Sequence, residues 1–191
     1  TALLTVIVKY NNVTEQPSNL TADLKVTLDY SQAPEGYVPP VTGPSIGGQP
    51  VEIVESGDGL YADEYESGKY IYKGTNPNNY ITFNNETWRI ISVENDGTIK
   101  IMRNESIGNQ IWDAGNSNAW ETSDIKTYLN DTYLPTITTN QDKIVSHTWS
   151  IGKVTDNNSD LAGQIAAENG TQSQSASIGM ITASEYLRAN T

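Results

Sequence analysis

The sequence contains no cysteine and only one histidine. Without cysteine the chain cannot form a disulfide, a thiol nucleophile, a zinc–thiolate site or an iron–sulfur cluster. Basic residues are also few, since 11 lysines and arginines stand against 23 aspartates and glutamates and the formal charge is −12. This charge repels polyanions, so nucleic acid is not expected as a partner.

Long apolar runs are absent as well. No window approaches the roughly 18 apolar residues of a membrane-spanning helix, so we expect no membrane span in this chain. The first ten residues lack the charged region and cleavage site of a signal peptide, and we expect any export signal to have been removed already. The chain has 11 tyrosines but one phenylalanine, and many Asn, Thr and Ser residues, a composition typical of β-rich surface proteins. It predicts an extracellular or cell-surface location.

The clearest fold signal lies in residues 80–104. Three segments, 80–83, 87–94 and 98–103, have the composition of β-strands. The connections Asn84-Asn85 and Asn95-Asp96-Gly97 tolerate the positive φ angles of tight turns. These features predict an antiparallel meander at the centre of the main domain.

Two further β-rich segments, residues 3–10 and 22–30, predict an N-terminal hairpin. One side of each strand is apolar, and those apolar residues are Val6, Val8, Tyr10, Leu24, Val26 and Leu28. An isolated hairpin is marginally stable in water, so this one must pair with something. It could be an ordinary hairpin on the main domain or the remnant of a cut domain. Alternatively, it could exchange strands with a neighbouring molecule.

Residues 33–50 contain five prolines and four glycines. Such a segment supports neither a helix nor a central strand, and we interpret it as a linker. The predicted organisation is a hairpin segment at 1–32, a linker at 33–50 and a domain at 51–191. The predicted fold class of that domain is α+β and β-rich, with an antiparallel meander and two or three short helices.

The remaining elements are short. We expect strands at 69–73, 147–154 and 177–181, a helical turn at 141–146 and a Gln/Ser-rich loop at 171–177. Ser123 or Thr122 caps a helix over 123–130 that Asn130-Asp131 and Pro135 end, and a second helix covers 159–168. Residues 182–185 form a capping box for a last helix. Because that helix has barely two turns before Thr191, we expect the natural polypeptide to continue and the domain to be incomplete at its C-terminus.

Candidate metal sites are weak. The acidic residues between Glu52 and Glu66 match no calcium-binding loop and are interpreted as a solvated face. Residues 156–160 copy the D-x-N-x-D opening of a calcium loop, but Leu161 and Ala167 occupy the positions that need glycine and glutamate. We interpret this segment as a turn and helix cap, and we expect no metal and no cofactor.

The tryptophans give the only candidate ligand site. Trp112 and Trp120 flank an irregular loop, Asp113 lies beside the first, and tryptophan with a carboxylate is a common way to bind carbohydrate. Core packing is the alternative, and it is favoured for Trp120 and for Trp88. His147 has no catalytic partner at motif spacing, and no phosphate loop, dinucleotide fingerprint or nucleophile elbow is present. We therefore do not expect an enzyme.

Four segments resemble an uncharacterised extracellular domain of Gram-positive gut bacteria: Gly68 to Gly74, Thr87 to Val93 (T-W-R-I-I-S-V), Trp120 to Asn130 (W-E-T-S-D-I-K-T-Y-L-N) and Ile178 to Leu187. The resemblance covers about residues 68–191 and implies an exported protein without a known activity. That family in turn looks like C-type-lectin folds, in which irregular loops carry binding. The N-terminal hairpin resembles the last strands of pilin-like or biofilm-fibre subunits.

These observations lead to three hypotheses. The first is a secreted or surface structural or adhesin-like protein, such as a filament or pilus-like subunit that assembles by β-strand addition. Its partner would be another copy of itself or another surface protein. The alternative is a lectin-like module that binds glycan or another small ligand at Trp112, Asp113 and Trp120. The least favoured is a hydrolase that uses carboxylates.

Overall fold

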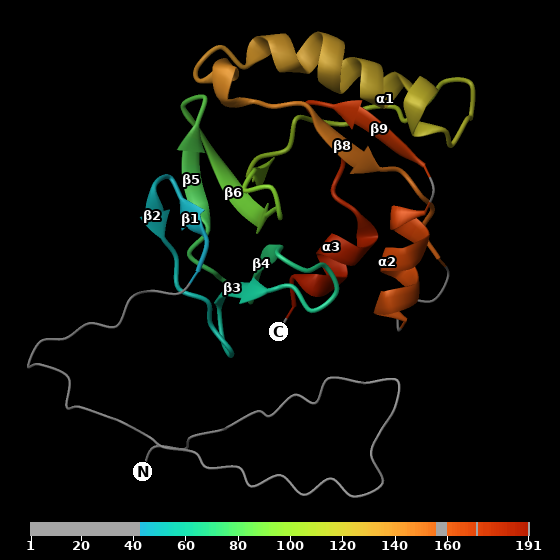
Figure 1. The fold of residues 1–191 in the computed structure, drawn as a ribbon. Coiled ribbons are helices and arrows are strands. Elements are labelled where there is room, and N and C mark those ends of the chain that lie inside the picture. The colour runs from blue at the N-terminus through green and yellow to red at the C-terminus, as the bar shows by residue number, and fades with distance from the viewer. Residues whose placement is uncertain (1–42, 156–159, 171, 191) are drawn as a thin grey trace, which may run out of the picture. The chain divides into compact units, whose positions relative to one another are not determined.

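The computed structural model describes residues 43–155, 160–170 and 172–190. They belong to one compact unit, Pro40–Thr191. The described part is mixed α+β with antiparallel sheets, so the predicted fold class is confirmed (Figure 1). The hairpin predicted for residues 1–32 lies outside the described residues. None of the described helices is long and apolar enough to cross a membrane.

The central sheet contains five strands, β3 (Gly59–Ala62), β4 (Tyr70–Lys73), β5 (Tyr80–Phe83), β6 (Glu86–Val93) and β7 (Ile99–Arg103). All pairings are antiparallel, and β6 pairs with β4, β5 and β7. The predicted meander is therefore confirmed as β5, β6 and β7. Its turns are made as expected, because Asn84, Asn85 and Gly97 have φ angles of 52°, 59° and 84°.

Alternate side chains of β6 are buried in the core. Trp88 and Ile90 are 8% and 3% exposed, and the ring of Phe83 packs edge-on against Trp88 with centroids 5.7 Å apart. The register with β7 shifts between Ile90 and Ser92. A bulge of this kind breaks the alternation, and the next two residues, Ser92 and Val93, are both buried.

The described end of the Pro/Gly-rich segment is more ordered than a plain linker. Strands β1 (Ser45–Ile46) and β2 (Gln49–Pro50) form a two-stranded hairpin. Gly47 and Gly48 occupy its turn with φ angles of 59° and 81°, the region that glycine enters without steric cost.

A helical segment follows the central sheet. It begins with η1 (Trp120–Thr122) and, after the extended Ser123, continues through α1 (Asp124–Thr127), the π-helical η2 (Tyr128–Tyr133) and η3 (Leu134–Thr136). The predicted cap is confirmed, since the Ser123 hydroxyl accepts a hydrogen bond from the Lys126 N–H at 3.2 Å. The predicted end at Asn130-Asp131 is wrong. The Asn130 amide donates to the carbonyl of Lys126, and Pro135 enters only the first turn of η3, where its missing N–H costs nothing.

A second sheet pairs β8 (His147–Ser150) with β9 (Ser173–Ala176). The strand predicted at 177–181 is wrong, because the strand lies in the Gln/Ser-rich segment predicted as a loop, and Met180 and Ile181 are each 45% exposed. Cross-strand bonding outweighs the weak β-propensity of Ser and Gln here. The Trp149 indole donates to the carbonyl of Ala176 at 2.8 Å and fixes the pairing.

The remaining helices are η4 (Gln141–Lys143), α2 (Leu161–Asn169) and α3 (Ala183–Arg188). Asp160 caps α2 through a hydrogen bond from the N–H of Gly163 at 2.8 Å, which confirms the cap expected at this position. The predicted capping box is also confirmed, since Thr182 and Glu185 bond reciprocally at the start of α3.

Candidate functional site

The predicted ligand loop brings its two tryptophans together. The rings of Trp112 and Trp120 have centroids 6.0 Å apart, and Trp120 is 7% exposed while Trp112 is 40% exposed. Trp120 packs with Ile125 and Leu129, so the prediction of a core role is confirmed for it, as it is for Trp88.

The polar groups of this loop bond mainly within it. The Trp112 indole donates to the carbonyl of Ser117 at 3.0 Å, and Asp113 accepts from the N–H of Ser117 at 2.9 Å. The carboxylate of Asp124 accepts from the N–H of Ala114. Trp112 is therefore the most exposed of the three residues predicted for this site.

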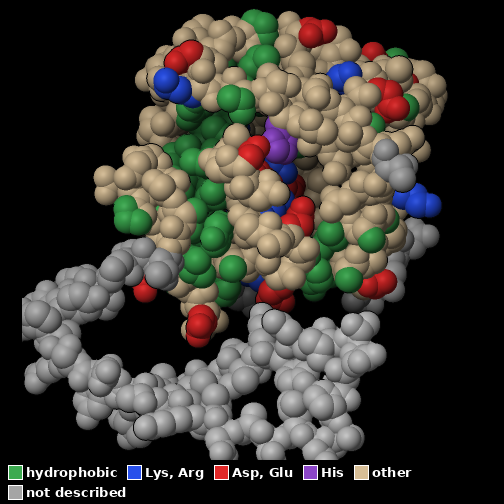
Figure 2. Space-filling model, in the orientation of Figure 1, with side chains coloured by type: hydrophobic (Ala, Val, Ile, Leu, Met, Phe, Trp, Pro, Cys, Tyr) green, Lys and Arg blue, Asp and Glu red, His purple; other side chains and the backbone are tan. Residues whose placement is uncertain are grey.

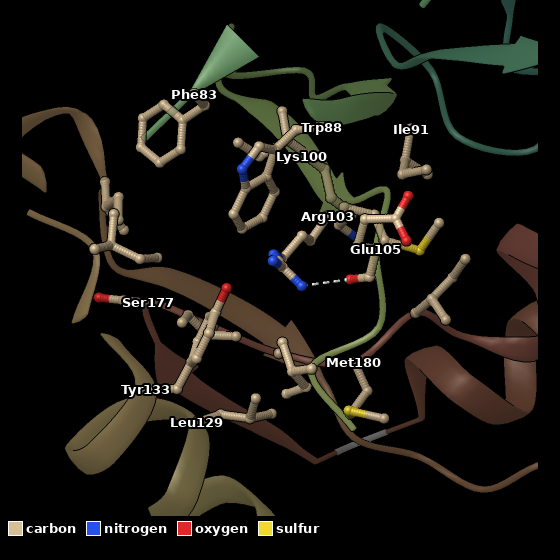
Figure 3. A pocket seen from close by; sticks show the side chains of 18 of the residues that line it. Phe83, Trp88, Ile91, Lys100, Arg103, Glu105, Leu129, Tyr133, Ser177 and Met180 are labelled. Atoms are coloured by element: carbon tan, nitrogen blue, oxygen red, sulfur yellow. Dashed lines mark hydrogen bonds between the residues drawn. The ribbon is translucent and has the colours of Figure 1, made fainter. Parts of the chain in front are cut away.

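A larger concave site lies between the central sheet and the helical segment. This Trp88 cavity has a volume of about 360 Å³ and is lined mainly by apolar side chains. Figure 3 shows Trp88 and Phe83 on one side of it and Tyr133 and Leu129 on the other. Ile101 of β7, Ile137 after η3, Trp149 of β8 and Ile178 after β9 complete the apolar wall. Residues far apart in the sequence thus meet at one hollow.

Trp88 lines the cavity, but its indole N–H is fully buried, and like that of Trp120 it makes no hydrogen bond to any described residue. The two basic side chains of the wall, Arg103 and Lys100, are each paired with a carboxylate. Arg103 donates to both carboxylate oxygens of Glu86, at 3.0 and 2.9 Å, and Lys100 pairs with Glu185 while lying over the Trp149 ring. Burial raises the pKa of the Tyr133 phenol on the same wall.

The unpaired side of β7 adjoins this cavity. Among the described strands β7 pairs only with β6, so its other edge has no strand partner. A second cavity, of about 260 Å³ and lined in part by α3, meets the Trp88 cavity at Ile91, Met102 and Ile181. We call these three residues together with Met180 the β7 apolar patch. Met102, Met180 and Ile181 are 38%, 45% and 45% exposed.

A third hollow, of about 230 Å³, is polar and charged. Figure 2 shows acidic and basic side chains gathered with the histidine in a hollow of this face. Lys69 bonds Glu66 and Glu94 at 3.2 and 3.3 Å, and Arg188 bonds Asp63 and Glu66. The interpretation of a solvated acidic face is therefore wrong for Asp63, whose side chain is 1% exposed and pairs with Arg188.

The pKa values of this hollow follow from burial and pairing. Burial alone would raise the pKa of Glu66, but Arg188 and Lys69 lower it below the ordinary value. Burial would lower the pKa of Lys69, but Glu94 and Glu66 raise it. The lowered pKa of Glu66 and the raised pKa of Lys69 both favour the charged, ion-paired forms of these side chains. The described residues contain no group of three or more His, Cys, Asp or Glu side chains arranged to hold a metal ion.

The strand-exchange residues Val6, Val8, Tyr10, Leu24, Val26 and Leu28 lie outside the described residues. The sequence reasoning missed the Trp88 cavity and the Arg188 ion pairs. The only local signal for the cavity was the apolar character of the strands around Trp88. The Arg188 ion pairs had no local signal, because Asp63 and Glu66 are more than 120 residues from Arg188 in the sequence. Comparison of the chain with protein-family models, with curated proteins and with solved structures gives no match.

Proposed function

We propose that the protein is a non-enzymatic, secreted or cell-surface structural subunit that assembles through β-strand addition. In this proposal the acceptor is the unpaired edge of β7. The donor is the N-terminal segment of a neighbouring copy, with Val6, Val8 and Tyr10 as its apolar side chains. An exposed strand edge offers unpaired N–H and C=O groups to an extended segment, and neighbouring pockets accept alternate side chains.

The observation that carries the proposal is the position of the β7 edge beside the β7 apolar patch. Natural proteins usually protect an edge strand with charged side chains. Here the more exposed β7 residues are Ile99 and Met102, at 37% and 38%. The charged ones are engaged elsewhere, Lys100 by Glu185 and Arg103 by Glu86. An apolar segment added at this edge would cover exposed Met and Ile side chains and gain about 25 cal/mol per Å² of apolar area buried.

The proposal is tested on the full chain by sedimentation velocity over a range of concentrations, with electron microscopy of the assembled state. We expect multimers for the wild type and monomers for Ile181→Lys and for Val8→Lys, which place a charge in the acceptor and in the donor. Ile111→Lys is the matched control, because Ile111 is 62% exposed and lines none of the three cavities described above. Monomeric wild type, or multimers that persist in both test variants, would reject strand addition.

A second candidate is glycan binding at Trp112, which the 40% exposure of its ring favours, since an open indole face stacks on sugar rings. Binding to a glycan array that is lost in Trp112→Ala and retained in Ile111→Ala would support it. A wild-type protein that binds no glycan would reject it.

A further inference from the structure

Arg89 on β6 is an arginine that no carboxylate of the described residues neutralises. The two other arginines of the chain, Arg103 and Arg188, are each bound by carboxylates. Arg89 is partly buried, and its side chain makes one hydrogen bond within the described part of the chain, from Nε to the side-chain oxygen of Asn79 at 3.3 Å. Its positive charge is therefore open to an anionic ligand.

Asn79 and Tyr80 hold the guanidinium of Arg89 in one orientation. Asn79 is 4% exposed, and its amide nitrogen donates to the carbonyl of Ile90 at 2.7 Å, which turns its oxygen toward Arg89. The central guanidinium carbon lies 5.0 Å from the centre of the Tyr80 ring, within the range of a cation–π interaction. The Nε edge of the guanidinium is thereby occupied, and its flat face is supported.

The Nη1 and Nη2 atoms of Arg89 remain for a ligand. Neither makes a hydrogen bond to a described residue. In the described chain, the fully buried side-chain nitrogen and oxygen atoms that lack a partner are the indole nitrogens of two tryptophans, so both Nη atoms have accessible surface. Arg89 lines the cavity of about 260 Å³ that α3 helps to form. Two parallel N–H donors match the two oxygens of a carboxylate.

The charges around this cavity favour a ligand with a single negative charge. Glu185 and Arg188 also line it, but Glu185 pairs with Lys100 and Arg188 with Asp63. Arg89 is left as one unbalanced positive charge in the lining. A dianion would bring a second negative charge near the Glu185 carboxylate, where like charges repel.

We propose that the cavity beside Arg89 binds small monocarboxylates with an apolar body, and that Nη1 and Nη2 of Arg89 donate parallel hydrogen bonds to the carboxylate. The apolar body lies against the apolar part of the lining, which includes Ile71, Pro77 and Ile90. The volume of about 260 Å³ is just below the usual range of ligand pockets, roughly 300–1,000 Å³, so the ligand is small.

This site goes beyond the proposed assembly but shares part of its surface. Ile91, Met102 and Ile181 of the β7 apolar patch also line the cavity, so a strand added at β7 would lie beside the ligand. Binding is therefore measured on full-length Val8→Lys as well as on the wild type, because that variant blocks the proposed donor and leaves the acceptor unchanged. Sedimentation reports assembly and titration reports binding, so either proposal can fail while the other holds.

The test compares benzoate with benzamide, which has nearly the same shape but no charge. Titrations are followed by calorimetry and by ¹⁵N–¹H spectra of the arginine Nε–H groups. An ionic strength of about 0.15 M, with a screening length of about 8 Å, weakens the repulsion from the formal charge of −12. We expect benzoate to bind roughly tenfold more tightly than benzamide, the effect of a hydrogen bond between charged groups, and to shift the Arg89 Nε–H signal.

Variants of Arg89 separate the paired hydrogen bonds from simple apolar burial. Arg89→Gln should remove the preference for benzoate, and Arg89→Lys should remove most of it, because lysine keeps the charge but lacks the planar pair of donors. Lys143→Gln is the matched control, since it also removes one positive charge but lies at a side chain that is 71% exposed and lines none of the three cavities. It should bind benzoate as the wild type does.

Three results would overturn the proposal. They are failure of both the wild type and Val8→Lys to bind benzoate, equal affinities for benzoate and benzamide, and a preference for benzoate that persists in Arg89→Gln. If Arg89→Gln does not fold, Arg89→Lys and the wild-type Nε–H shift decide.

Discussion

Arg188 in α3 and Asp63 in the β3–β4 connection form a buried ion pair, with side chains that are 4% and 1% exposed. They are 125 residues apart in the sequence. Arg188 also bonds Glu66 at 2.9 Å, and the carbonyl of Ala189 accepts the N–H of Gly74 at 2.9 Å. The C-terminal helix is thereby tied to the first strands of the central sheet.

Removing one member of this pair should destabilise the domain strongly. We expect Arg188→Ala to lower the free energy of unfolding by about 3–5 kcal/mol, because it leaves the Asp63 carboxylate buried without a cation. Urea unfolding measures the change. Lys143→Ala, which removes an ion pair between side chains that are both 71% exposed, is the control and should leave the midpoint nearly unchanged. A small effect of Arg188→Ala would mean that water reaches Asp63.

Stability should also fall at acidic pH. Burial would raise the pKa of Glu185, but the charge and hydrogen bond of Lys100 hold it below its ordinary value of 4.5, and Glu66 is lowered in the same way by Arg188 and Lys69. A carboxylate whose pKa is lower in the folded state stabilises the fold above its unfolded pKa and loses that contribution as the pH falls through the folded pKa. We therefore expect urea midpoints that are constant from pH 7 to about 5 and that fall below about 4.5.

The pH dependence can be assigned to a single group. Glu185→Gln keeps the shape of the side chain but removes its titration, so the variant should be less stable at pH 7 and should lose less stability between pH 5 and 3. An unchanged slope would show that Glu185 contributes nothing. Lys69 acts in the opposite sense at alkaline pH, because its pKa is raised in the folded state. Its stabilising contribution is present below the ordinary pKa of 10.5 and is lost as the pH rises through the folded-state pKa.

The capping box at α3 gives a smaller, local prediction. The Thr182 hydroxyl accepts the N–H of Glu185 at 3.2 Å, and the Glu185 carboxylate accepts the N–H of Thr182 at 2.9 Å. We expect Thr182→Ala to cost about 1 kcal/mol in urea unfolding and Thr182→Ser to cost much less, because serine keeps the accepting oxygen. Equal costs for the two variants would point to lost packing of the threonine methyl group instead.

The parts of the fold that the sequence predicted are the ones determined by neighbouring residues. The cap at Ser123, the box at Thr182 and the turns at Asn84-Asn85 each depend on side chains within a few positions of one another. The segment 171–181 was predicted wrongly because its pairing is non-local. Ser173–Ala176 becomes a strand only through β8, more than 20 residues earlier in the chain.

The candidate site depended even more on tertiary structure. Trp88 was correctly predicted to be buried, but the space in front of its ring is bounded by residues from β7, η2, β8 and the segment after β9. No spacing in the sequence brings these together. The partners of Arg188 were likewise hidden, since an acidic cluster near residue 63 is usually solvated unless a distant cation reaches it.

Gly179 gives a prediction that links the fold to the Trp88 cavity. A Cβ atom at this position would lie 2.5 Å from two carbon atoms of the Trp149 ring. That ring cannot easily move, because its N–H bonds the Ala176 carbonyl at 2.8 Å and Lys100 lies 4.8 Å above its centre. We expect Gly179→Ala to cost about 1–3 kcal/mol in unfolding experiments and to shift the Trp149 indole signal. In a Trp149→Leu background the same substitution should cost less, since the clash is with the indole. Equal costs in the two backgrounds would mean that the chain at Gly179 relaxes without meeting Trp149, and that this wall of the cavity is not close-packed.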